Sequence, residues 1–175
     1  MKKSTLFSTL AFAFVMLLST NVDAQKFAGL DKSPMDAAIY KTSRNAPAIA
    51  KVIYSRPQLK GRSLGSLAPN GKVWRTGANE AANVTIYKDV KIGDKAVSPG
   101  EYSLFTIPGE KEWIIILNKD INVWGAYSYN KDHDVIRVSA PVSSGDELEA
   151  FSIAFSDGTM HLGWGTVRVN VPFSI

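Results

Sequence analysis

Residues 71–82 hold the densest group of chemically versatile side chains in the sequence. The segment, GKVWRTGANEAA, contains an indole, a guanidinium, an amide and a carboxylate from Trp74, Arg75, Asn79 and Glu80. It has no clear period of 2 or 3.6, so an amphipathic strand or helix does not explain it. A guanidinium offers a planar fork to carboxylate, phosphate or sulfate, and an indole offers a flat face to a sugar ring. The segment therefore predicts a ligand-binding site.

Two further groups of residues are expected near this segment. Arg56 and Arg62 precede it, in a stretch from Lys51 to Arg75 that contains no Asp or Glu. An irregular aromatic stretch follows later in the chain, either as part of the site or as a cluster that closes one end of the fold: Trp124, Tyr127 and Tyr129. Loops on a rigid β scaffold commonly carry binding sites. We expect a small or polymeric anionic or carbohydrate-like ligand to contact Arg56, Arg62, Trp74, Arg75, Asn79 and Glu80.

Glu80 also supports two alternatives to ligand binding. It is the best single acid or base in the segment, which would make the protein a hydrolase if a second carboxylate or a histidine lies close to it. It could instead form an ion pair with Arg75 that fastens the loop, with Trp74 in the core. A further alternative is a structural or interaction module of the cell envelope, which would show a large apolar surface patch and no pocket.

The sequence gives little support for metal binding or for nucleophilic catalysis. His133 and His161 are isolated from one another, and a zinc site needs three or four ligands, usually with short-range pairs. There is no cysteine, no Gly-x-Ser-x-Gly motif and no P-loop. No metal site and no cofactor are predicted.

The first 24 residues have the pattern of a signal peptide. Lys2 and Lys3 precede an apolar run from Leu6 to Leu18, and Val22-Asp23-Ala24 places small residues at a cleavage site. The apolar run is too short to cross a hydrocarbon core of roughly 30 Å. We expect cleavage after Ala24, a periplasmic or secreted mature protein, and no membrane span in that mature chain.

Composition restricts the partners and the source of stability. The formal net charge is +4, which is too mild for a nucleic-acid-binding protein. An exported chain without cysteine has no disulfides, so packing alone must hold the fold together.

Hydrophobic patterning predicts an all-β protein. Residues 25–47 lack periodicity and are expected to form an N-terminal arm, followed by one domain over 48–175. Short alternating or apolar runs separated by turn residues predict strands at 48–55, 83–88, 90–92, 96–97, 101–107, 113–117, 135–139, 150–156, 159–164 and 167–171. About eight to ten short strands and no confident helix indicate an antiparallel β-sandwich or a jelly-roll.

Four stretches of the chain resemble a family. They are Tyr54-Ser55-Arg56-Pro57, Lys60-Gly61-Arg62, the block from Gly71 to Ala81, and Gly100-Glu101-Tyr102-Ser103-Leu104. Together they resemble the domain-of-unknown-function family numbered 2911, over about residues 33–173. The resemblance implies an exported bacterial protein with an all-β fold and no assigned activity. This chain departs from the expected pattern at Ser63–Ala68 and at Gly165.

Overall fold

The computed structural model describes residues 25–175, of which Asp31–Ile175 form one compact unit. The predicted signal peptide, residues 1–24, lies outside the described residues. In the described part of the chain, no helix has the length and apolar character needed to cross a membrane.

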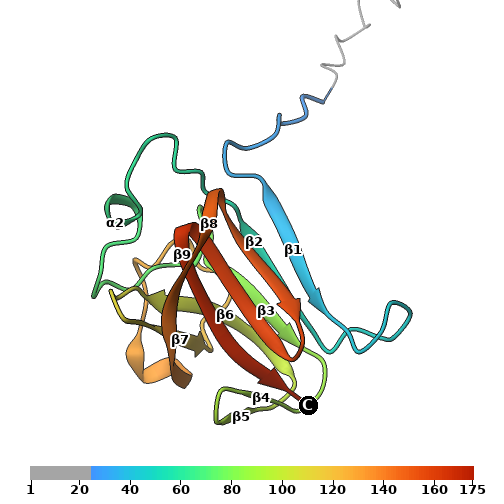
Figure 1. The fold of residues 1–175 in the computed structure, drawn as a ribbon. Helices are drawn as coiled ribbons and strands as arrows, with labels where there is room; N and C mark the ends of the chain where they lie inside the picture. Colours follow the sequence, from blue (N-terminus) through green and yellow to red (C-terminus); the bar gives the residue numbers. More distant parts are fainter. Residues whose placement is uncertain (1–24) are drawn as a thin grey trace, which may run out of the picture. The chain divides into compact units, whose positions relative to one another are not determined.

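Antiparallel strands dominate the unit, which confirms the all-β class predicted from the patterning (Figure 1). The strands are hydrogen-bonded into one nine-stranded sheet of order β1-β2-β3-β6-β7-β8-β9-β4-β5. Their bounds are β1 Met35–Tyr40, β2 Ala50–Ser55, β3 Ala82–Ile86, β4 Val90–Ile92, β5 Lys95–Val97, β6 Gly100–Ile107, β7 Glu112–Asn118, β8 Asp134–Ser156 and β9 Thr159–Ser174. Between them lie the short helix α2, Leu64–Leu67, and a 3-10 turn, Lys131–His133.

The last two strands are longer than the sequence predicted. Four predicted short strands merge pairwise into β8 and β9, and β9 alone has 16 residues. A straight strand of that length would span about 50 Å. Yet Phe173 N donates to Gly158 O at 2.7 Å, so β9 doubles back on itself, as its two arms in Figure 1 show. Gly165, with φ 54°, lies where the chain reverses.

β1 was missed by the sequence analysis, which placed these residues in an N-terminal arm without a predicted strand. The strand sequence MDAAIY has weak alternation and follows Pro34, so it carries little local signal. Its extended state depends on pairing with β2, from Met35 opposite Ser55 to Tyr40 opposite Ala50. Tertiary pairing therefore outweighs local propensity here.

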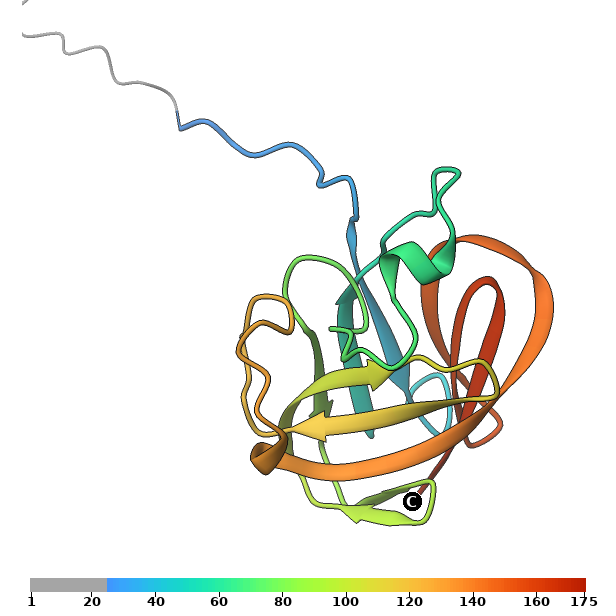
Figure 2. The ribbon, with the colours of Figure 1, turned by 90° about the vertical axis from the view of Figure 1, so that its left-hand side faces the viewer.

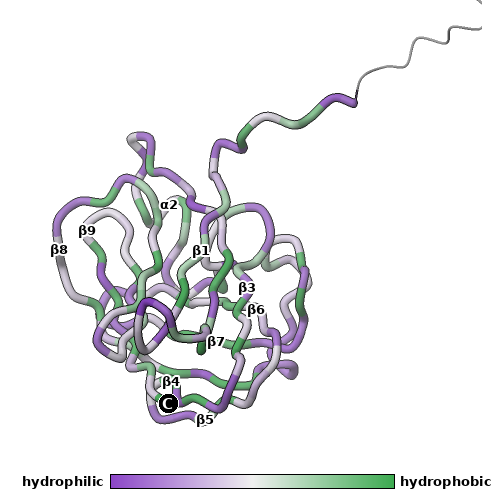
Figure 3. Tube along the Cα trace, turned by 90° about the vertical axis from the view of Figure 1, so that its right-hand side faces the viewer, coloured by the Kyte–Doolittle hydropathy of each residue, from purple (hydrophilic) through white to green (hydrophobic). Residues whose placement is uncertain are grey.

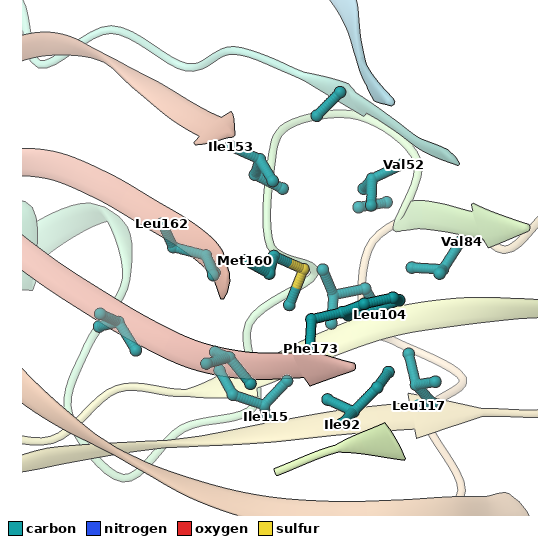
Figure 4. Packing of buried hydrophobic residues seen from close by; sticks show 14 of the residues in the cluster. Val52, Val84, Ile92, Leu104, Ile115, Leu117, Ile153, Met160, Leu162 and Phe173 are labelled. Carbon is teal, nitrogen blue, oxygen red and sulfur yellow. The ribbon is translucent and has the colours of Figure 1, made fainter. Parts of the chain in front are cut away.

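One face of the sheet forms the main hydrophobic core. Val52, Val84 and Leu104 alternate inward from β2, β3 and β6 and are at most 2% exposed. Figure 4 shows them converging with side chains from β7, β8 and β9, among them Ile115 and Leu162. Each such side chain contributes about 1.5–3 kcal/mol when it leaves water, which is the driving force for a fold without disulfides.

β7 is covered on both faces, as its uninterrupted apolar sequence predicted. Trp113, Ile115 and Leu117 belong to the main core, whereas Ile116 joins Phe105 in a second cluster on the opposite face. That second cluster lies beneath the loop between β7 and β8, which contributes Val123, Ala126 and Tyr129. Along the strands, hydrophobic positions are interspersed with hydrophilic ones (Figure 3).

A polar network anchors the end of this β7–β8 loop. The Tyr129 hydroxyl donates to Asp134 Oδ2 at 2.7 Å, and Arg137 donates to both groups at 2.6 Å. Asn118 Nδ2 donates to the other oxygen of Asp134 at 2.9 Å. Desolvation and the hydrogen bond to Asp134 raise the pKa of Tyr129, and the bond to Asp134 raises the pKa of Arg137. The network holds the loop against the sheet.

Candidate functional site

The 71–82 segment is a folded loop that begins beside β6, on the edge of that strand where β3 also pairs. At its start Trp74 forms a two-way bridge with Thr106, whose carbonyl accepts from Trp74 N at 2.7 Å. At its end Ala82 N donates to Arg75 O at 3.0 Å, which closes the loop. Its carbonyls and amides therefore have partners where the segment enters and leaves the fold.

Backbone hydrogen bonds join this loop to the β7–β8 loop, and the two lie next to one another in Figure 2. Ala81 N donates to Val123 O and Gly125 N donates to Asn79 O, both at 2.9 Å, and Glu80 forms an isolated bridge with Trp124. Segments that are 40 residues apart in the sequence thus form one structural unit, which we call the paired loops, residues 71–82 and 119–130.

Backbone strain concentrates in the paired loops. Among the described residues five non-glycine residues have positive φ, and three of them are here: Thr76 at 53°, Asn79 at 61° and Asn122 at 57°. Asparagine tolerates this region, but for a β-branched residue such as Thr76 it is a true outlier. Thr76 is fully buried and bonds to Thr106 Oγ1 at 3.2 Å. Strain of this kind tends to gather at functional sites.

Trp74 belongs to the core. It is 6% exposed, and its ring is stacked on Trp164 at a centroid distance of 5.4 Å. Trp113 and Phe151 meet it edge-on at 6.0 and 4.9 Å. These contacts occupy most of the indole surface and leave only its margin for a ligand.

Arg56 and Arg62 are engaged in holding the scaffold. Arg56 binds Asp36 at 3.1 Å, Phe151 O at 3.1 Å and Ser152 Oγ at 2.7 Å, so it ties β1 to β8. Arg62 donates to Leu59 O at 2.9 Å and to Gln58 O at 2.7 Å, which fixes its own turn. The structure does not bring these two guanidinium groups together with Arg75, because each forms its hydrogen bonds in a different part of the fold.

Glu80 lines a hollow of about 520 Å³ on the outer face of the sheet. We call it the Glu80 pocket. Its lining residues come from β1, β2, β3, β6 and both paired loops: Met35, Ile53, Tyr54, Ser55, Glu80, Ala81, Asn83, Glu101 and Asn122. Strand alternation places Ile53, Ser55, Asn83 and Glu101 on the face opposite the core.

The polar groups of the Glu80 pocket are largely free. Within residues 25–175, the carboxylates of Glu80 and Glu101 and the amide of Asn122 have no side-chain hydrogen bond, and Glu80 forms no ion pair with Arg75. Ser55 is 5% exposed, and its hydroxyl likewise has no partner in this part of the chain. The Ser55 hydroxyl is not among the fully buried polar atoms without a partner, so it borders the pocket as a free hydrogen-bonding group.

Arg75 lines a different hollow, of about 260 Å³. We call it the Arg75 cleft, and its lining is Leu67, Pro69, Val73, Trp74, Arg75, Ala126 and Tyr127. Asn79 lines neither hollow, although its carbonyl links the loops. Arg75 and Glu80 are only five positions apart in sequence, but their side chains line separate hollows.

The three aromatic residues of the later stretch have different environments. Trp124 is 59% exposed and Tyr127 is 85% exposed, so neither closes the core. Tyr129 packs edge-on against Phe105 at 5.1 Å and has the anchoring role described above. Only Tyr127 lines one of the two hollows.

The two histidines lie in separate places. His133 Nδ1 is 2.7 Å from Asp120 Oδ1, whereas His161 lies between Ser156 Oγ at 2.9 Å and Asn170 Oδ1 at 2.8 Å. His161 and its partners are cross-strand neighbours on a solvated face, where polar side chains ordinarily pair. Among residues 25–175 no group of three or more His, Asp or Glu side chains could hold a metal ion.

Of the nine residues that line the Glu80 pocket, only Glu80 was predicted as a site residue; those not predicted include the polar residues Ser55, Asn83, Glu101 and Asn122. Three of them are outward-facing polar positions of β2, β3 and β6. Alternation gives their face, but only the order β2-β3-β6 makes them neighbours. No sequence pattern pointed to Asn122, because only the pairing of the two loops brings it to the pocket.

The fold and these hollows define an antiparallel all-β protein with an open polar pocket beside strained loops. The chain belongs to the family described as a protein of unknown function, DUF2911, whose model matches residues 33–173. No curated protein and no solved structure matches the chain. Three of the stretches that carry the family resemblance meet at the Glu80 pocket, through Ser55, Glu80 with Ala81, and Glu101.

Proposed function

We propose that this protein is exported and binds a neutral, carbohydrate-like ligand in the Glu80 pocket. One observation carries the proposal. Two carboxylates, two amides and a hydroxyl surround one hollow with free hydrogen-bonding capacity, supplied by Glu80, Glu101, Asn83, Asn122 and Ser55. Carboxylate and amide groups are the acceptors and donors that vicinal hydroxyl groups can satisfy together.

The rest of the pocket suits the apolar face of a sugar ring. Ile53 and Met35 lie beside the polar groups, and Met35 is 65% exposed. The volume of about 520 Å³ falls in the range of about 300–1,000 Å³ typical of small-molecule sites. Two carboxylates at the rim disfavour an anionic ligand. The proposal therefore keeps the carbohydrate-like part of the sequence-based expectation for this pocket and leaves out the anionic part.

Export rests on the pattern of residues 1–24. A positive start, a short apolar run and small residues before Gln25 are typical of a cleaved signal peptide. A periplasmic or secreted protein would meet soluble sugars and the glycans of the cell envelope. Amino-terminal sequencing of the protein from an exporting host tests this step, and an intact Met1 would contradict it.

Calorimetric titration of the mature protein with neutral mono- and disaccharides, such as glucose, N-acetylglucosamine, cellobiose and maltose, tests the binding step. We expect saturable binding of at least one sugar, weakened about tenfold or more by Glu80→Gln, because hydrogen bonds to a charged acceptor are stronger than neutral ones. Glu110→Gln makes the same charge change on a distant exposed turn and should bind as the wild type does. No saturation up to about 10 mM with any sugar refutes the proposal.

A hydrolase is the second candidate, and the presence of Glu101 in the same pocket favours it. Sugar hydrolysis uses two carboxylates that flank the bond to be cleaved. In this reaction Glu80 or Glu101 would protonate the leaving oxygen while the other carboxylate activates water or attacks the sugar. Release of nitrophenol from nitrophenyl glycosides tests it. Activity that survives in both Glu80→Gln and Glu101→Gln would rule out this pair as the catalytic groups.

A further inference from the structure

The Arg75 guanidinium lies in the paired loops without a partner among the described residues. Within residues 25–175 its side chain forms no hydrogen bond and no ion pair, and its Nε atom is buried with no partner. Leaving a buried donor unsatisfied is costly, more so when the group is charged. Arg56, Arg62, Arg137 and Arg168 all have oxygen partners. Arg75 thus differs from these four arginines, because they bond to oxygen atoms within the fold and it does not.

The surroundings of Arg75 leave room for an anion. The cleft of about 260 Å³ is lined by Val73, Pro69 and Tyr127, and none of its lining residues is acidic. A guanidinium in such a place has lost part of its water without gaining a counter-ion. A ligand carboxylate in the cleft can accept from the terminal N–H groups of the guanidinium, two at a time, because the fork of arginine matches its geometry.

Gly125 keeps this arrangement in place. A Cβ atom at Gly125 would lie 2.7 Å from Tyr127 Cε2 and 3.0 Å from Arg75 Nη1, so both side chains pack over the bare backbone of this residue. Its φ of 66° is also in the region that favours glycine. The aromatic ring and the guanidinium therefore both lie against Gly125, and the ring remains largely exposed.

We propose that the Arg75 cleft is a second binding site, for a small monocarboxylate that carries an apolar or aromatic group. Arg75 would bind the carboxylate, and the ring of Tyr127 with Val73 and Pro69 would contact the apolar part. The walls offer no second cation, so a doubly charged phosphate is matched less well than a carboxylate. This site is separate from the Glu80 pocket, and the proposal holds whether or not that pocket binds sugar.

Benzoate is the probe, followed by amide shift changes in NMR and by calorimetry on the mature protein. Benzamide, which has the same ring without the charge, and inorganic phosphate are the comparison ligands. We expect benzoate to bind with shifts centred on Val73, Ala126 and Tyr127, and benzamide and phosphate to bind at least about tenfold more weakly.

Variants test whether benzoate binding depends on the Arg75 guanidinium or only on positive charge in this segment. Arg75→Gln should weaken benzoate binding about tenfold or more, whereas Lys72→Gln makes the same charge change in the same segment and should have little effect. Arg75→Lys keeps the charge without the fork and should be intermediate. Thermal unfolding confirms that each variant is folded. Equal benzoate binding by wild type and Arg75→Gln, or no saturable binding of benzoate at all, overturns the proposal.

Discussion

The Glu80 pocket and the Arg75 cleft are built by the same paired loops but have opposite character. The pocket is wide, polar and acidic at its rim, and its floor is the outer face of the sheet. The cleft is small and apolar around a single cation, and it reaches Trp74 at the margin of the core. Hydrogen bonds join residues 79–81 to 123–125, and both hollows are lined from these segments or from residues close to them in sequence. Neighbouring residues of one loop can therefore serve different ligands.

Replacing Trp74 should have the largest effect, because it removes the support that both hollows share. Trp74→Ala leaves a cavity among Trp113, Phe151 and Trp164 and should lower the free energy of unfolding by about 3–5 kcal/mol. Chemical denaturation measures the change. A loss below about 1 kcal/mol would mean that the indole is a replaceable part of the Arg75 cleft.

Gly125→Ala should disturb the Arg75 cleft selectively. The positive φ costs roughly 1–2 kcal/mol for a residue with a Cβ, and the new methyl group meets Tyr127 and Arg75. We expect loss of benzoate binding with sugar binding unchanged. Gly65→Ala is the control, since a Cβ there meets nothing within 4 Å. If both ligands are lost, the two hollows are coupled.

Tyr129→Phe should show how strongly the network anchors the paired loops. The folded pKa of Tyr129 is raised above the ordinary value of about 10, so the protonated phenol stabilises the fold. That stability is fully present below about pH 10 and is lost as the pH rises through the raised pKa. The variant should lose about 1 kcal/mol at neutral pH and show a smaller decline in alkali.

Denaturation of the variant and the wild type across pH 8 to 11 gives both quantities. Tyr127→Phe is the matched control, because Tyr127 is 85% exposed and its hydroxyl has no partner within the described residues. The pKa of Tyr54 is also raised, mainly by desolvation, and contributes an equal alkaline decline to all three proteins. Identical pH profiles for the wild type and Tyr129→Phe would contradict the anchoring role.

The smallest effects are expected from the two charged residues themselves. Arg75→Met removes an unsatisfied buried donor and should be neutral or stabilising by up to about 1 kcal/mol. Glu80→Gln should change stability by less than about 0.5 kcal/mol, because its exposed carboxylate holds nothing together. A loss of several kcal/mol in both variants would restore the ion-pair alternative, in which these residues fasten the loop.

Most strands could be predicted because each carries its own signal. β4 was placed at its observed bounds, and β2, β3, β6 and β7 were placed within about two residues of their ends, from alternation, apolar runs and turn residues. β1 escaped because its pairing with β2 decides its state, and α2 escaped because a single turn of helix has too little periodicity to detect.

The binding site at residues 71–82 stays a prediction, and the structure shows where its residues lie. Glu80 and Arg75 each line a hollow. Their union with Arg56 and Arg62 in one site was expected from cationic composition alone. The structure does not bring these residues together. Composition cannot predict this outcome, because it does not say which carbonyls and carboxylates each guanidinium will bind.

By itself the sequence determined the all-β class and the family, because alternation and local motifs are encoded in neighbouring residues. Only the tertiary structure decided which side chains meet. Left-handed residues at 76 and 79 turn the loop between Arg75 and Glu80, and pairing with 123–125 directs the two side chains to separate spaces. That outcome depends on contacts between segments some 40 residues apart, which no local pattern contains.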